Sequence, residues 1–238
     1  NEKDFFNLMD VYLDAVLYPK LYEMPEIFMQ EGWHHEIFNK DDEIVYRGVV
    51  YNEMKGAYSS PETILNEAVL KSLLPDTCYR YSSGGNPDFI PELTREAFIN
   101  FHKKYYHPSN SYVFLYGNGN IDKQLQHIDE NYFSHFDKIE IDSTIARQTP
   151  FTERADFTEY YNISKDDNDQ NKTYLSLNFI LGDISDLETS LATSIIAQIL
   201  MQSEAAPLKK ALLEAGIGED VFALTSAGQE AAQERGTL

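Results

Sequence analysis

Apolar residues recur at the helical period at the start of the chain. Over residues 5–17 they fall at Phe5, Leu8, Met9, Tyr12, Leu13 and Val16. This spacing predicts a helix that Pro19 ends. A second, short helix is predicted over residues 24–30, with Gly32 just beyond it, where glycine is favoured. Residues 33–38 are then predicted to be extended.

Residues 44–58 are predicted to form one helix with small side chains on one side, at Gly48, Gly56 and Ala57. Glycine inside a helix costs about 1 kcal/mol relative to alanine. The pattern therefore indicates that another backbone approaches this helix closely and that Glu53 is held against something in the interior. The alternative is a packing groove with Glu53 at its hydrated edge, and the residues alone do not separate the two.

The remainder of the chain alternates between segments with the helical period and segments typical of strands. Helices are predicted over residues 62–74, 91–105, 121–132, 187–202 and 207–215, and strands over residues 111–116, 157–163 and 173–181. Residues 139–151 follow neither period and are interpreted as part of a linker. Helices and strands on both sides of a linker favour two units of the α+β class.

The composition argues against several classes of function. The formal charge is −20, from 39 acidic and 19 basic residues, which disfavours nucleic acid because its binding depends on Lys and Arg. No apolar run approaches the ~20 residues that span a bilayer, so no membrane segment is predicted. A single cysteine, Cys78, excludes an internal disulfide and a zinc site built from several cysteines.

His34, His35 and Glu36 form the most conspicuous cluster of potential metal ligands. A helical H-E-x-x-H zinc site needs a second histidine four positions after His35, where the chain has Asn39. In an extended segment adjacent side chains point to opposite faces, so the two histidines are interpreted as strand residues. The inverted motif H-x-x-E-H is absent, because no glutamate in the chain is followed directly by histidine.

Six short segments carry distinctive sequences. They are DFFNLMDVYLDAV (4–16), QEGWH (30–34), YRGVVYNEMKGA (46–57), LLPD (73–76), SGGNP (83–87) and YHPSN (106–110). In sequence, order and separation they resemble the presequence proteases of the pitrilysin–insulinase family of zinc metallopeptidases. The similarity extends from the first residues to about Asp220 and weakens from Phe222 onward.

The resemblance implies an α+β domain repeated four times, with two repeats in each half of a closing chamber. Residues 1–140 would be the distal part of the first repeat, 141–156 a linker and 157–238 the opening part of the second. In the family an H-x-x-E-H motif supplies two zinc ligands and a general base, and here it would lie upstream of Asn1. The resemblance also implies that Glu53 is the third zinc ligand and that Glu31 is a further active-site acid.

The sequence thus predicts a fragment of a zinc-dependent endopeptidase that degrades short, unstructured peptides and is inactive by itself. Its expected partners are peptide substrates and the remaining domains of the same polypeptide. One alternative is a non-catalytic homologue that acts as a peptide-binding or structural half. A weaker one is an unrelated acidic scaffold, in which Glu53 faces solvent with no helix beside it. The absence of a transit segment favours the bacterial cytoplasm over the mitochondrial matrix.

Overall fold

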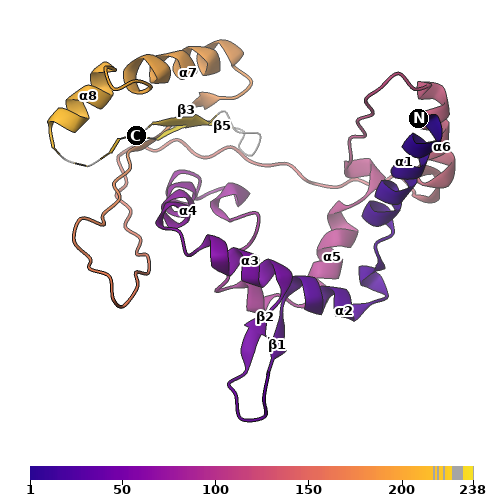
Figure 1. The fold of residues 1–238 in the computed structure, drawn as a ribbon. Helices are drawn as coiled ribbons and strands as arrows, with labels where there is room; N and C mark the ends of the chain where they lie inside the picture. The colour runs from indigo at the N-terminus through magenta and orange to yellow at the C-terminus, as the bar shows by residue number, and fades with distance from the viewer. Residues whose placement is uncertain (217, 219, 222, 227–232, 238) are drawn as a thin grey trace. The chain divides into compact units, whose positions relative to one another are not determined.

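The computed structural model describes residues 1–216, 218, 220–221, 223–226 and 233–237. Backbone contacts divide the chain into two units, Asn1–Lys55 with Asn86–Thr144 and Gly56–Gly85 with Ile145–Leu238. Both contain helices and a small antiparallel sheet (Figure 1), so the predicted α+β class is confirmed. Among the described residues, no helix combines the length and the apolar character needed to cross a bilayer.

The first unit consists mainly of helices and contains one hairpin. Its strands are β1 (His34–Glu36) and β2 (Val45–Arg47), and its longer helices are α1 (Glu2–Leu17), α3 (Val49–Ala57), α5 (Arg95–Tyr105) and α6 (Ile121–Asn131). Its short turns are η1 (Lys20–Tyr22), α2 (Pro25–Ile27), the π-helical η2 (Phe28–Gly32), η4 (Ile90–Glu92), η5 (Pro108–Asn110) and η6 (Phe133–His135). The hairpin projects at the end of the unit where α2 and α3 lie (Figure 1). α1 begins at Asn1, whose side chain accepts a hydrogen bond from the backbone N–H of Asp4 at 3.0 Å.

The prediction of one helix over residues 44–58 is wrong in its first part. Strand β2 occupies Val45–Arg47 and pairs with β1, with His34 opposite Arg47 and Glu36 opposite Val45. Gly48 follows at φ +151°, outside the helical region, and α3 starts only after it. A three-residue strand is too short to show a period, so no boundary could be recognised here from the pattern of residues.

The second unit packs one helix on a strand distant in sequence. α4 (Pro61–Leu73) begins after Ser60, whose hydroxyl accepts from the backbone N–H of Thr63. Val69, Leu73 and Leu74 pack with Ile180 on β3 (Asn178–Asp183). The other elements are η3 (Cys78–Arg80), α7 (Leu187–Met201), α8 (Pro207–Glu214), β4 (Leu224–Ser226) and β5 (Gln233–Thr237). The sheet order is β3-β5-β4 with antiparallel pairing.

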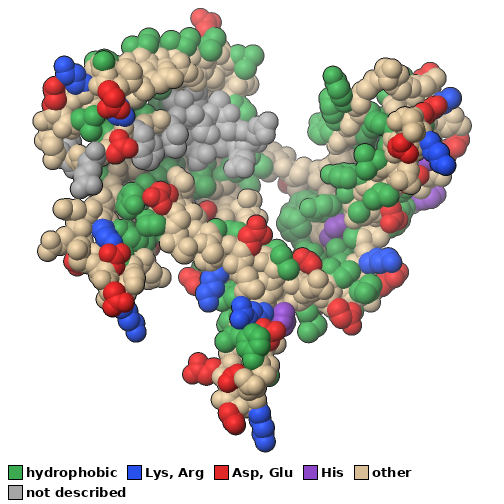
Figure 2. Space-filling model, in the orientation of Figure 1, with side chains coloured by type: hydrophobic (Ala, Val, Ile, Leu, Met, Phe, Trp, Pro, Cys, Tyr) green, Lys and Arg blue, Asp and Glu red, His purple; other side chains and the backbone are tan. Residues whose placement is uncertain are grey.

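Several apolar stretches remain exposed. The predicted strand 111–116 has no ladder partner among the described residues, and Tyr112, Phe114 and Tyr116 are almost fully exposed. Residues 157–163 likewise form no strand in the described part of the chain, and the prediction for 173–181 is reduced to β3. Figure 2 shows a further row of apolar side chains along α7, which includes Leu187, Leu191, Ile195 and Ile199.

The region between the two predicted repeats contains no regular structure. Residues 139–151 form neither helix nor strand. The limits of the linker at 141–156, and the assignment of the flanking residues to two consecutive repeats, remain predictions.

Candidate functional site

Helix α3 presents Glu53 on its accessible side. The Gly48 carbonyl accepts the backbone N–H of Asn52 at 3.0 Å and so closes the first turn of the helix. Tyr51 is buried, whereas Glu53, about 200° further round the helix, is exposed. No described residue forms a hydrogen bond or ion pair with the Glu53 carboxylate, so both of its oxygens are available to a ligand.

Glu31 lies in the π-helical turn η2, directly before the hairpin. Its carboxylate is exposed and likewise has no hydrogen-bonding partner within the described part of the chain. π-Helical turns are rare and often occur at functional sites. Trp33 anchors the chain just after this turn, because its indole N–H donates to the Leu93 carbonyl at 2.9 Å.

The segments that carry Glu31 and Glu53 meet at two glycines. A Cβ atom placed on Gly48 would lie 2.1 Å from the carbonyl oxygen of Gly32 and 2.7 Å from Cα of Trp33. A close backbone approach to a glycine of this segment was one of the two readings that the sequence left open, but the same reading held Glu53 against the interior, and Glu53 is exposed. The approaching backbone is that of Gly32 and Trp33, however, and Gly48 precedes the helix.

Aromatic rings join the hairpin to α3 beside this contact. The Tyr46 ring on β2 lies 5.7 Å from Trp33, 5.1 Å from His35 and 5.9 Å from Tyr51, measured between centroids. Such aromatic contacts add roughly 0.5–1.5 kcal/mol each beyond the area they bury. The hairpin and the helix are thus held together at the point where α3 begins.

His34 and His35 lie in strand β1, as the sequence indicated. His34 donates from Nδ1 to the carbonyl of Met29 at 2.7 Å, which fixes its ring within its own segment. Within the described residues, no group of three or more His, Cys, Asp or Glu side chains could hold a metal ion. The candidate metal ligand in this chain is the single carboxylate of Glu53, which suits zinc as one oxygen donor.

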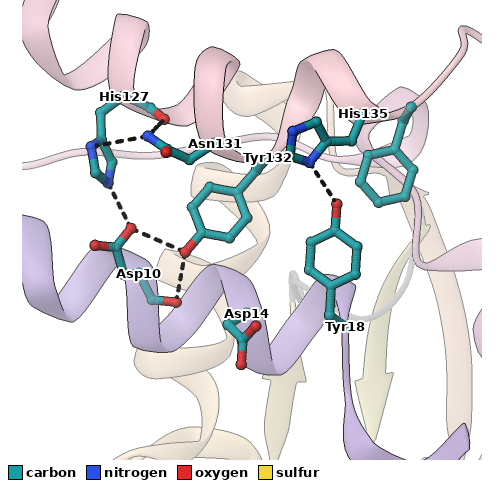
Figure 3. A pocket seen from close by; sticks show the side chains of 8 residues that line it. Asp10, Asp14, Tyr18, His127, Asn131, Tyr132 and His135 are labelled. Carbon is teal, nitrogen blue, oxygen red and sulfur yellow. Dashed lines mark hydrogen bonds and ion pairs between the residues drawn. The ribbon is translucent and has the colours of Figure 1, made fainter.

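A second polar cluster lies between α1 and the segment of α6 and η6 (Figure 3). His127 Nε2 donates to the Asp10 carboxylate at 2.6 Å, and the Tyr132 hydroxyl donates to the same oxygen at 3.0 Å. The amide of Asn131 lies 3.3 Å from Nδ1 of His127, so both imidazole nitrogens have partners. The open pocket beside them has a volume of about 740 Å³. It is lined by Asp10, Asp14, Tyr18, His127, Asn131, Tyr132, His135 and Phe136.

This cluster was not predicted, and it joins two helices. Burial raises the pKa of Tyr132 to about 12, helped by the hydrogen bond to Asp10 and the charges of Asp10 and Asp14. The sequence places Asp10 and Asp14 four residues apart on one predicted helix, and His127 and Asn131 four apart on another. That spacing marks two polar helix faces but does not show that they face each other. The hydrogen bonds of the cluster join α1 to α6 and to the residue that follows α6.

Comparison with known proteins finds one matching family model and several similar sequences. Residues 92–233 match the family described as the Peptidase M16 inactive domain. The chain is 58% identical over 221 residues to Protein HypA of Clostridium perfringens, which covers 93% of the chain and 23% of HypA. It is 41% identical over 231 residues to Presequence protease 1, chloroplastic/mitochondrial, of Arabidopsis thaliana (96% and 21%). It is 39% identical over 224 residues to Presequence protease, mitochondrial, of Danio rerio (92% and 22%).

The chain therefore spans less than a quarter of the length of these relatives. Glu31 and Glu53 both precede the residues that match the inactive domain, which begin at residue 92. The two candidate site residues are thus covered by the similarity to the three relatives and not by the family match.

Proposed function

The chain belongs to the M16 peptidase family, which matches more than half of its length, and from this membership we propose that it is a piece of a zinc-dependent endopeptidase. The longer polypeptide would degrade short, unstructured peptides, and this chain would be inactive by itself. Within that proposal residues 1–140 are the distal part of one repeat, 141–156 a linker and 157–238 the opening part of the next.

Glu53 is proposed as one zinc ligand. The observation that carries this assignment is its exposed carboxylate, free of hydrogen bonds to described residues, on a helix whose start is fixed by the hairpin. A catalytic zinc takes three protein ligands and keeps one position open. The two other ligands and the general base are expected from an H-x-x-E-H motif elsewhere in the polypeptide.

Glu31 is proposed as a supporting acid. Histidines that bind zinc usually donate their second N–H to a carboxylate, which orients the ring. The exposed Glu31 side chain, at the end of a turn anchored by Trp33, is available for such a bond. When bound, zinc would lower the pKa of its water towards ~7 and polarise the scissile carbonyl. The two carboxylates would hold and orient that centre.

The proposed substrates are basic peptides. The formal charge of −20 favours encounter with cationic ligands, and two of the relatives are named presequence proteases. The other proposed partners are the remaining domains of the same polypeptide. A bacterial cytoplasmic location is favoured by the similarity to HypA of Clostridium perfringens, whereas the names of the other two relatives include the mitochondrion.

The test is the Glu53→Gln variant of the complete polypeptide. It should lose bound zinc, measured by metal analysis after dialysis, and kcat/KM for a quenched peptide should fall by about 100-fold or more. Glu43→Gln is the matched control, because Glu43 is also exposed but lies outside α3. Full zinc content and full activity in Glu53→Gln would refute the assignment.

A non-catalytic homologue is the second candidate, and the match of residues 92–233 to an inactive domain favours it. This candidate predicts that the complete polypeptide lacks an intact H-x-x-E-H motif, binds no zinc and still binds peptides saturably. The sequence of the encoding gene before Asn1, together with the zinc content, separates the two candidates.

A further inference from the structure

We propose that Gly48 is a positioning residue that fixes the distance between the segment of Glu31 and the helix of Glu53. The inference rests on the proposed function, and it concerns a residue to which no role has been assigned. Gly48 touches neither substrate nor metal. It acts by fixing the position at which α3 starts.

The contact at Gly48 leaves no room for a side chain. A Cβ atom there would lie 2.1 Å from the oxygen and 2.7 Å from the carbon of the Gly32 carbonyl, and 2.7 Å from Cα of Trp33. These are backbone atoms, which cannot rotate away as a side chain can. Since nonbonded heavy atoms pack at about 3.5–4.0 Å, a methyl group would force the two backbones apart by about 1 Å. The φ of +151° adds a conformational cost for any residue with a Cβ.

Both sides of the contact are anchored, so a displacement is passed on. Trp33 is bonded to the Leu93 carbonyl, and His34 is paired with Arg47 in the ladder. On the other side, the Gly48 carbonyl accepts the first helical hydrogen bond of α3. Glu53 lies five residues further on, about 7.5 Å along the helix axis. A shift at Gly48 therefore moves α3, and Glu53 with it, relative to Glu31.

Metal binding is sensitive to such a shift. Zinc binds carboxylate oxygen at about 2.0–2.2 Å, so a displacement of about 1 Å is large compared with the bond. Loss of supporting contacts around a zinc site typically lowers its metal affinity about 10–100-fold. The lack of a side chain at Gly48, against the backbone of Gly32 and Trp33, thus sets the separation that one metal ion and its supporting acid require.

The experiment compares Gly48→Ala with Gly32→Ala in the complete polypeptide. The atoms nearest to a Cβ on Gly32 would be those of the Phe28 ring, from 3.5 Å, which is an ordinary contact distance. The control therefore adds the same methyl group beside the same junction without a clash. Gly48→Ala should weaken zinc about tenfold or more in competition with a chelating dye, and should change the visible spectrum of the cobalt(II) form. Its kcat should fall while KM stays within about twofold, and Gly32→Ala should match the wild type in all four measurements.

Glu53→Gln, measured in parallel, separates the two ideas. If it loses zinc while Gly48→Ala keeps it, the positioning role is wrong and the proposed function stands. If Glu53→Gln keeps zinc, both fall. An equal loss in Gly32→Ala and Gly48→Ala would also overturn the inference, because any added methyl group would then suffice.

A milder variant decides the matter should Gly48→Ala fail to fold. Trp33→Phe keeps a ring but removes the N–H that donates to Leu93 at 2.9 Å, which loosens the anchor on the Gly32 side. It should weaken zinc binding by about threefold or more. A zinc affinity equal to that of the wild type in this variant would overturn the proposal.

Discussion

Replacement of Asp10 by alanine removes a carboxylate that joins α1 to α6, although the Asp10 backbone carbonyl still accepts from the Tyr132 hydroxyl at 3.1 Å. Its carboxylate receives hydrogen bonds from His127 at 2.6 Å and from Tyr132 at 3.0 Å, and Tyr132 is 8% exposed. Hydrogen bonds to a charged group contribute about 1.5–3 kcal/mol each. The Asp10 side chain remains 44% exposed, so water offsets much of this, and we expect a loss of about 2 kcal/mol in the free energy of unfolding.

Trp33 provides the assay, because it is the only tryptophan of the chain and lies in the same unit as Asp10. Urea unfolding followed by its fluorescence should show a lower midpoint for Asp10→Ala. Asp14→Ala is the matched control, since Asp14 lies one turn further along α1 with an exposed carboxylate that no described residue hydrogen-bonds. It should stay within about 0.5 kcal/mol of the wild type. An equal loss in the two variants would refute the reasoning, because net charge rather than the bonded carboxylate would then matter.

Three other outcomes follow from the described contacts. The folded-state pKa of Tyr132, about 12, lies above its ordinary value of 10.0. This shift contributes up to about 2.7 kcal/mol to the free energy of unfolding, a contribution that should be complete below pH 10 and lost as pH rises to 12. In unfolding curves measured over this pH range, the free energy of unfolding should fall less steeply with pH in Tyr132→Phe than in the wild type. Gly56→Ala should stabilise the isolated chain by up to about 1 kcal/mol in urea unfolding, because no described atom lies within 4 Å of the added Cβ; destabilisation would contradict this. Leu74→Ala removes a side chain that is 1% exposed and should lower the free energy of unfolding, measured by amide exchange in α4, by about 2–5 kcal/mol. Leu187→Ala, at a side chain that is 77% exposed, should lower it little.

Local signals made most helices predictable. α1, α4, α5 and α6 each begin after a residue whose side chain caps the first turn, namely Asn1, Ser60, Thr94 and Asn120. Each also has apolar residues at the helical period, so the sequence of about a dozen residues was sufficient to predict the helix. The capping residue and the period are properties of the segment itself and need no partner.

Strands and the junctions between segments depended on distant residues. Residues 111–116 are rich in the aromatic and β-branched residues typical of strands. A strand forms only where a neighbour offers backbone donors and acceptors, and the described chain offers none there. The contact of Gly48 with Gly32 and the bond between Asp10 and His127 likewise join residues that no local pattern links. Glu53 was found through a family resemblance, because on its own residues the helix could equally have been a packing groove.

The exposure of Glu53 bears differently on the competing functions. An unrelated acidic scaffold would also leave this carboxylate in solvent, but membership of the M16 family removes that alternative. Under the proposed function, a ligand whose metal partners come from another segment must be accessible when that segment is absent. α3 meets this condition in a specific way, since it buries Tyr51 against the hairpin and turns Glu53 outward. A peptide-binding homologue without metal has no need for such a free carboxylate, so the zinc content of the complete polypeptide is the measurement that distinguishes the two remaining functions.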